Sequence, residues 1–157
     1  MEFILVTQRE MDEVISLYRK AIGTMGCTWD ENYPSLEHTL SDISRGDLFC
    51  LRTQEGEIIG AISIDDDEEV EKLDCWMEGG AELSRLVVKE SYQNKGIAGM
   101  MLKKAMEVLK SRGYKYVHFL VSKDHIKALK AYDKLNFNQV GEADLYGGNW
   151  WCYEQQL

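Results

Sequence analysis

The sequence contains one proline, three histidines and no long hydrophobic run among its 157 residues. No apolar stretch approaches the roughly 20 residues that a membrane-spanning helix requires, so we expect no membrane association. The opening segment, MEFILVTQREMDEV, has neither a basic lead-in nor a small-residue cleavage site. We therefore expect no secretory signal peptide.

The four cysteines are scattered through the chain, and no CxxC pair is present. Without an export signal, this pattern indicates reduced thiols and a cytoplasmic protein. His38 and His118 have no neighbours at metal-ligand spacing, so we expect structural or exposed roles for them and no metal site. The acidic stretch from Asp65 to Glu69 is interpreted as a solvated loop, with a metal site as the less favoured alternative.

Basic residues are also in short supply. Lysine and arginine number 18 against 27 aspartates and glutamates, which gives a net charge of −9. Nucleic-acid binding depends on clustered lysine and arginine, so this class of partner is not expected. The acidity is compatible with a cationic substrate, but it also serves solubility alone.

Short strand patterns alternate with amphipathic helix patterns along the whole chain. The sequence predicts strands at residues 3–6, 81–88, 115–121, 138–145 and 150–157, and two more within residues 47–67 on either side of a hairpin turn at Gln54–Glu57. The predicted helices begin at Thr7, after Pro34–Ser35, after Gln93 and near Asp124. A capping box of Thr7 and Glu10 marks the first helix start.

This order of elements is β-α-α-β-β-β-α-β-α-β-β. Hairpin signals at both ends predict a mostly antiparallel sheet, while the passage from Ala81 to Val121 requires a parallel crossover. We therefore expect an α/β fold with one mixed (α+β) sheet and about four flanking helices, in a single domain of residues 1–157.

The stretch ESYQNKGIAGMMLKKAM places Gly96 and Gly99 where an amphipathic helix should begin. Glycine starts helices poorly, but a strand end, a tight turn and a helix N-terminus together present unpaired N–H groups. Without Cβ atoms, an anion can approach this main chain closely. The run Gln93 to Ala98 could thus bind a pyrophosphate; alternatively, Gly96 forms a turn and Gly99 packs against the sheet.

Two other phosphate motifs do not fit this stretch. A Walker loop requires GKS or GKT, which is absent. The dinucleotide fingerprint fails because only one of its glycines has a counterpart and the strand pattern is not doubly wound.

The same stretch resembles motif A of the GCN5-related N-acetyltransferase (GNAT) superfamily, Q/R-x-x-G-x-G/A. Gln93, Gly96 and Ala98 occupy its three fixed positions, and Leu86 and Val88 match the L-x-V of the preceding strand. Downstream, KALKAYDKLNF resembles motif B, with Ala128, Tyr132 and Phe137 at its Ala, Tyr and final Phe. The element order agrees over essentially the whole chain.

This resemblance implies a GNAT-like fold, acetyl-CoA as acetyl donor and a primary amine as acceptor. In that family the motif A strand carries a bulge and diverges from the next strand, opening a slot for the pantetheine arm. The main chain of Leu86, Val87 and Val88 would then pair with pantetheine amides. The pyrophosphate would bind at Gln93, Asn94, Lys95, Gly96, Ile97 and Ala98.

The resemblance also implies catalytic roles. Tyr132 is the candidate general acid, because a phenol directed at the leaving thiolate can protonate it; packing in the core is the alternative for this residue. Glu82 is the candidate base, since histone acetyltransferases of the superfamily place a glutamate eleven residues before the motif A glutamine. An exposed strand glutamate, with water as the base, is the alternative there.

Two positions depart from the family pattern. His125 stands where motif B commonly has an asparagine that touches the cofactor, three residues before Ala128. A histidine can still donate a hydrogen bond there. Asn136 replaces a glycine before Phe137, and asparagine tolerates the left-handed conformation that ends helices.

For the acceptor side, the resemblance points to the first two helices, their connection and the late hairpin. The candidate residues are Trp29, Asp30, Glu31, Tyr33, Glu82, Tyr146 and Trp150. Aromatic rings and carboxylates can bind an ammonium group, but the same aromatics also anchor irregular loops. The function is thus interpreted as an N-acetyltransferase, with a non-catalytic acetyl-CoA binding or sensing module as alternative. Homodimers are common in the family.

Overall fold

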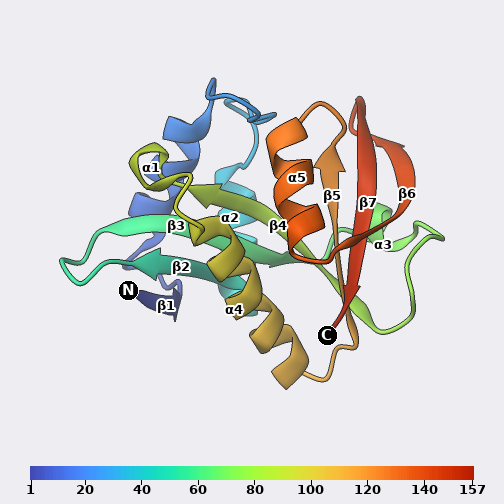
Figure 1. The fold of residues 1–157 in the computed structure, drawn as a ribbon. Coiled ribbons are helices and arrows are strands. Elements are labelled where there is room, and N and C mark those ends of the chain that lie inside the picture. Colours follow the sequence, from blue (N-terminus) through green and yellow to red (C-terminus); the bar gives the residue numbers. More distant parts are fainter. The chain divides into compact units, whose positions relative to one another are not determined.

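The computed structural model describes all residues from Met1 to Leu157. Seven strands form a mostly antiparallel sheet in the order β1-β2-β3-β4-β5-β7-β6. The strands are β1 (Glu2–Leu5), β2 (Leu48–Arg52), β3 (Ile58–Asp65), β4 (Gly80–Val88), β5 (Tyr116–Ser122), β6 (Asn138–Leu145) and β7 (Gly148–Gln156). The helices are α1 (Met11–Ala21), α2 (Leu36–Arg45), α3 (Glu68–Glu71), α4 (Ile97–Ser111) and α5 (Ile126–Lys134), with a 3₁₀ turn η1 (Glu90–Tyr92) (Figure 1). The predicted mixed sheet is confirmed, and so is the predicted element order except for α3, which the sequence did not predict.

The chain divides into two compact units, which are described separately. The first comprises Met1–Ile64 and Arg85–Ala105, and the second comprises Asp65–Ser84 and Met106–Leu157. Strand β4 contributes its first five residues to the second unit and Arg85–Val88 to the first. No helix of the structure has the length and apolar character needed to cross a membrane. All four cysteines are free.

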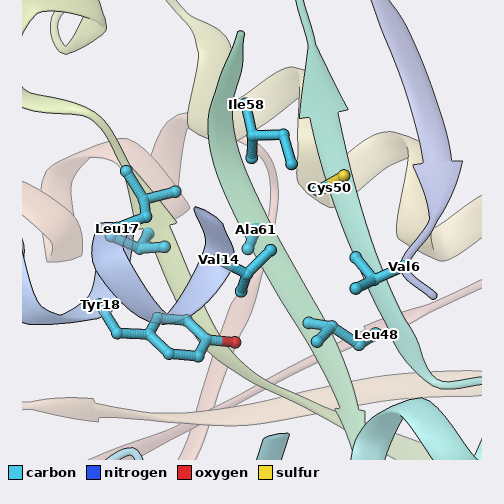
Figure 2. Packing of buried hydrophobic residues seen from close by; sticks show 9 residues of the cluster. Val6, Val14, Leu17, Tyr18, Leu48, Cys50, Ile58 and Ala61 are labelled. Atoms are coloured by element: carbon cyan, nitrogen blue, oxygen red, sulfur yellow. The ribbon is translucent and has the colours of Figure 1, made fainter. Parts of the chain in front are cut away.

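In the first unit, β1, β2 and β3 form an antiparallel meander, in which Ile4 pairs with Cys50 and Cys50 with Ala61. Helix α1 buries Val14, Leu17 and Tyr18 against this meander. The resulting cluster also contains Val6, Leu48, Cys50, Ile58, Ala61 and Val87 (Figure 2). Because this core includes Val87, it fixes the last residues of β4 in the first unit.

The start of α1 differs from the prediction. The helix begins at Met11 rather than directly after Thr7. The Glu10 carboxylate accepts hydrogen bonds from both the Thr7 N–H (2.8 Å) and the Thr7 hydroxyl (2.7 Å). The Thr7 side chain therefore donates to Glu10, so residues 8–10 form a turn before the helix.

Helix α2 begins and ends as predicted. The Ser35 hydroxyl accepts from the His38 N–H (3.1 Å), while His38 Nδ1 accepts from the Ser35 N–H (3.2 Å). This reciprocal pair is a capping box, with histidine in place of the usual Glu or Gln. Gly46 ends the helix in a left-handed conformation at φ 72°. His38 thus has the structural role expected of it.

In the second unit, β5 pairs with β7 and β7 with β6, both antiparallel. Tyr146 and Gly147 close the β6–β7 hairpin with φ values of 55° and 74°. Two left-handed residues make a type I′ turn, whose twist matches that of the flanking strands. Strand β5 is parallel to β4, with three residue pairs from Gly80↔Tyr116 to Glu82↔His118.

The acidic stretch after β3 was predicted as a loop, and this prediction is wrong in part. Residues Glu68–Glu71 form the short helix α3, whose N-cap Asp67 accepts from the Glu69 N–H (3.0 Å). Carboxylates in a first helical turn are stabilised by the helix dipole, which explains why this charged segment can be helical. Val70, which is buried, anchors the turn.

Candidate functional site

The β4–α4 loop (residues 89–96) connects the end of β4 to α4 within the first unit. The Lys89 N–H donates to the Ile59 carbonyl (2.8 Å), which holds the start of the loop on β3. The Gln93 amide nitrogen donates to the Val88 carbonyl (3.0 Å) and braces the loop from inside. Asn94 and Gly96 then adopt left-handed conformations, at φ 62° and 77°. These two residues turn the chain sharply into α4.

The main-chain N–H groups of residues 94–99 donate no hydrogen bond within the protein. The first bond of α4 runs from the Met100 N–H to the Gly96 carbonyl (3.1 Å). A Cβ atom built on Gly96 would meet nothing within 4 Å, so the main chain is open at this point. Free donors at the positive end of a 15-residue helix bind anions, and phosphate groups in particular.

Most residues of this loop are exposed, and Lys89 and Tyr92 are partly buried. The Lys95 ammonium group lies 5.5 Å from the centre of the Tyr92 ring, within cation–π range. Lys95 thus adds positive charge beside the free N–H groups. Gln93, for which the sequence predicted an anion contact, already uses its amide nitrogen on Val88, and its second amide hydrogen remains to be donated.

A pocket of about 590 Å³ lies between the end of α1 and the end of β4, in the first unit. Its lining residues are Leu17, Lys20, Ala21, Thr24, Val87, Val88, Lys89, Glu90, Ser91 and Gln93. The pocket places the main chain of Val87 and Val88 beside the β4–α4 loop. A ligand bound at the loop can therefore extend along the end of β4.

Arg85, in the middle of β4, has a left-handed conformation at φ 49°. A left-handed residue in a strand is typical of a β-bulge, which bends the strand and re-aims its neighbours. The guanidinium of Arg85 forms a buried ion pair with Asp42 of α2 (2.8 Å). Sequence analysis missed both residues, although a charged residue at an inward position of an alternating strand is a signal of a buried partner.

Glu82 lies in the part of β4 that belongs to the second unit, and its side chain is only 5% exposed. One carboxylate oxygen each of Asp65, Asp67 and Glu82 lies within 4.8 Å of the others. These three residues are called the carboxylate cluster below. The Ser84 hydroxyl donates to Asp65 (2.8 Å), and the Tyr146 hydroxyl donates to Asp67. Burial and this bond to Asp67 raise the pKa of Tyr146.

The carboxylate cluster concentrates negative charge around the candidate base. Such a group of oxygen ligands suits an alkylammonium group or a metal ion. Sequence analysis expected no metal, and that expectation stays a prediction. It singled out Glu82, which belongs to the carboxylate cluster, and Tyr146, whose hydroxyl donates to Asp67 of the same cluster. It did not select Asp65 and Asp67 as site residues, because a solvated loop was favoured over a metal site for their acidic segment.

Tyr132 projects from α5 in the second unit, where its ring packs against Phe119, Phe137 and Tyr153. The ring centres of Tyr132 and Phe119 are 4.8 Å apart. The Tyr132 hydroxyl forms no hydrogen bond within the protein. Burial raises the pKa of this phenol to about 12, so it is protonated at neutral pH. The ring therefore has the packing role and the hydroxyl retains a proton to donate.

His125 is the N-cap of α5. Its Nδ1 atom accepts a hydrogen bond from the Ala128 N–H (3.3 Å), a role that asparagine also performs at helix starts. Burial lowers the pKa of His125, which keeps the ring neutral and Nδ1 able to accept. The substitution of histidine for the family's asparagine thus preserves the helix cap.

The aromatic residues between α1 and α2 contact the protein itself. The Trp29 ring packs edge-on against the rings of Tyr18 and Tyr33, whose centres lie 5.4 Å and 6.5 Å from its own. The Tyr33 hydroxyl accepts from Arg85 (3.1 Å). In the second unit, the Trp150 ring nitrogen donates to the Leu145 carbonyl (2.8 Å). These contacts fit the loop-anchoring role, and acceptor binding by Trp29 and Trp150 stays a prediction.

Comparison with known proteins identifies the class. Residues 11–137 match the model of the acetyltransferase (GNAT) family, so the chain belongs to that family. The resemblance found in the two sequence motifs is thereby confirmed.

Solved structures show the same fold. The ribosomal-protein-alanine N-acetyltransferase from Brucella melitensis is 16% identical, with a TM-score of 0.76 and full coverage of both chains. The yncA protein from Salmonella typhimurium, solved with its cofactor acetyl-CoA, is 15% identical with a TM-score of 0.77, covering 100% of this chain and 94% of the other. The PaiA N-acetyltransferase from Thermoplasma acidophilum, in complex with coenzyme A, is 19% identical with a TM-score of 0.75, covering 99% and 98%.

Proposed function

We propose that the protein is an acetyl-CoA-dependent N-acetyltransferase, with the whole chain acting as one domain and a primary amine as acceptor. The observation that carries this proposal is the row of free N–H groups from Asn94 to Gly99, which includes the two left-handed residues Asn94 and Gly96. Such a row suits a pyrophosphate, which is the charged centre of acetyl-CoA. Family membership and the relatives that contain acetyl-CoA or coenzyme A support the same donor.

The binding roles follow from the positions of these residues. The β4–α4 loop would bind the pyrophosphate through its main chain, and Lys95 would add a positive charge. The end of β4, which borders the 590 Å³ pocket, would bind the pantetheine arm through main-chain groups. The residues proposed to contact the cofactor are Leu86, Val87, Val88, Gln93, Asn94, Lys95, Gly96, Ile97, Ala98, His125, Ala128 and Tyr132.

Bound acetyl-CoA would supply an acetyl thioester, and this chain would supply the groups that handle protons and charge. A main-chain N–H near Val88 would polarise the thioester carbonyl as an oxyanion hole does. Glu82 would take a proton from the acceptor ammonium, which leaves a nucleophilic amine. The Tyr132 phenol, whose pKa is about 12, would protonate the leaving thiolate.

The acceptor is proposed to carry positive charge. Asp65 and Asp67 lie beside Glu82, and the three carboxylates favour an alkylammonium group over a neutral amine. Tyr146, whose hydroxyl is bonded to Asp67, would present its exposed ring to the same substrate. Trp29 and Tyr33 remain proposed contacts of the acceptor in the first unit.

Two measurements test the proposal. Saturating acetyl-CoA should raise the melting temperature, because a ligand that binds only the folded state stabilises it. A thiol-release assay across neutral, singly charged and doubly charged amines should then show turnover, fastest for the charged amines. Absence of stabilisation would refute acetyl-CoA binding. Binding without turnover of any amine would indicate a sensing module instead.

A further inference from the structure

The left-handed conformation of Arg85 is costly for an arginine. An L-residue with a Cβ atom loses roughly 1–2 kcal/mol in this region, which is why glycine usually occupies it. In a β-bulge of this type the left-handed position is typically a glycine. Arg85 adopts φ 49° nevertheless, so surrounding contacts must compensate for the strain.

Those contacts come from Asp42 and Tyr33. Arg85 Nε donates to Asp42 Oδ2 (3.0 Å), and Nη2 donates to Asp42 Oδ1 (2.8 Å). Nη1 donates to the Tyr33 hydroxyl (3.1 Å). Arg85 is 6% exposed and Asp42 is 1% exposed. A two-pronged, buried arginine–carboxylate pair fixes the orientation of the guanidinium, and with it the path of the backbone that carries it.

Asp42 also accepts one hydrogen bond from β3 and one from its own helix, α2. The Ser63 hydroxyl of β3 donates to Asp42 Oδ2 (2.7 Å), and Arg45 Nη2 donates to Oδ1 (2.9 Å). Arg45 also donates to the Ile64 carbonyl (3.1 Å). The carboxylate is therefore tied to β3 and α2, and it forms a fixed point to which Arg85 is bound.

A need for stability explains this pair poorly. Desolvation of two charges cancels much of their attraction, so well-packed apolar side chains often stabilise a core as well or better. The position of the pair indicates a role in the shape of the neighbouring pocket. Arg85 directly precedes Leu86, Val87 and Val88, and Val87 and Val88 line the pocket beside the β4–α4 loop.

We infer that Asp42 and Arg85 are positioning residues for the acetyl donor. Their ion pair holds Arg85 left-handed and so aims the main chain of Leu86–Val88 toward the pantetheine arm. This inference rests on the proposed function, because it assumes that acetyl-CoA binds along the end of β4. The resemblance to the family implies only that this strand has a bulge. The inference concerns the side chains that maintain the bulge in this protein.

A double-mutant cycle on acetyl-CoA affinity tests the inference. Asp42→Asn in the wild-type background should raise the Kd of acetyl-CoA about tenfold, which corresponds to the roughly 1.4 kcal/mol at stake in a left-handed residue. Arg85→Ala should raise Kd by a similar factor. Arg85→Gly should stay within about threefold of wild type, since glycine adopts φ 49° without assistance. In the Arg85→Gly background, Asp42→Asn should then have no further effect on Kd.

The measurements are isothermal titration calorimetry with acetyl-CoA and with coenzyme A, and steady-state kinetics. The affinity loss should appear as a higher KM for acetyl-CoA with kcat within about twofold, because saturating ligand restores the bound path of β4. Thr39→Val is the matched control. Thr39 is a buried residue of α2 whose hydroxyl donates to the Ser35 carbonyl (3.1 Å) and bonds neither Asp42 nor Arg85, so the variant should lower stability without changing Kd.

The outcomes distinguish a failure of the proposed function from a failure of this inference alone. Wild-type protein that fails to bind acetyl-CoA would overturn the proposed function and this inference together. Normal wild-type binding, with equal Kd values for Arg85→Ala and Arg85→Gly, would overturn the inference alone. So would an Asp42→Asn effect of equal size in both backgrounds. If Arg85→Ala does not fold, the two Asp42→Asn comparisons still decide the question.

Discussion

The β4–α4 loop and the carboxylate cluster bring polar groups together by opposite means. The loop uses main-chain N–H groups of consecutive residues, turned outward by the left-handed Asn94 and Gly96. The cluster uses side chains from the end of β3, the segment before α3 and the middle of β4. The main-chain site is formed by one short stretch of sequence, whereas the side-chain site combines residues from separate elements of the fold. The first is the site proposed for the acetyl donor, and the second is the site proposed for the acceptor amine.

Replacement of Glu82, the candidate base, should produce the largest loss of activity. It changes the carboxylate cluster and leaves the β4–α4 loop intact. Glu82→Gln is expected to lower kcat/KM for the amine about a thousandfold at pH 6.5, within the usual range for general-base catalysis. The loss should shrink as the pH approaches the pKa of the amine, which then deprotonates without help. A pH–rate profile of both proteins measures this.

The control for that variant is Glu154→Gln, another buried glutamate of the second unit, which accepts from the Met77 N–H (2.9 Å). It should leave the pH–rate profile unchanged. Equal profiles for wild type and Glu82→Gln would exclude Glu82 as the base, and the carboxylate cluster would lose its catalytic member.

Removal of the Tyr132 hydroxyl should have the next largest effect. Tyr132→Phe keeps the ring packed on Phe119 and should lower kcat about a hundredfold, with the Kd of acetyl-CoA unchanged. Tyr153→Phe is the matched control, because Tyr153 belongs to the same aromatic group and its hydroxyl donates to Asp133. If both variants have the same kcat, the core-packing role of Tyr132 is sufficient.

The main-chain site should respond to strain rather than to charge. Gly96→Val places a β-branched residue at φ 77° and a side chain where the anion approaches, so Kd for acetyl-CoA should rise at least about tenfold. Gly113→Val is the control, since Gly113 at φ 91° follows α4 at its other end and is equally open. It should cost stability and leave Kd unchanged; a matching rise in both variants would contradict a local role for Gly96.

The smallest expected effect concerns the cap of α5. Folding lowers the pKa of His125 from its ordinary value of 6.5, so the neutral ring contributes stability above that pH which is lost as the pH falls. Wild type should therefore lose up to about 1 kcal/mol relative to His125→Asn between pH 7.5 and pH 5.5, the usual value of an N-cap. Urea unfolding at both pH values measures the difference, and parallel losses in the two proteins would refute it.

Much of the fold could be predicted from local patterns. Hydrophobic spacing, Ser35 and Gly46 located α2, and the glycine-containing turn at Tyr146–Gly147 located the last hairpin. The predicted helix boundaries that proved wrong lie where alternative hydrogen-bond partners compete. At Thr7, the Glu10 carboxylate takes the hydroxyl that was expected to cap α1, and at Asp67 a side-chain cap allows a helix in a segment too acidic to be predicted as one.

The sequence by itself determined the family, the order of the elements and the stretch from Gln93 to Ala98, because each depends on residues close together in the chain. Tertiary structure alone decided that Asp42 binds Arg85, that Asp65 and Asp67 gather around Glu82, and that Trp29 packs on Tyr18. These contacts join residues that lie between 11 and 43 positions apart in the chain. Burial and geometry select such partners from many charged or aromatic candidates, and no local pattern distinguishes the one chosen.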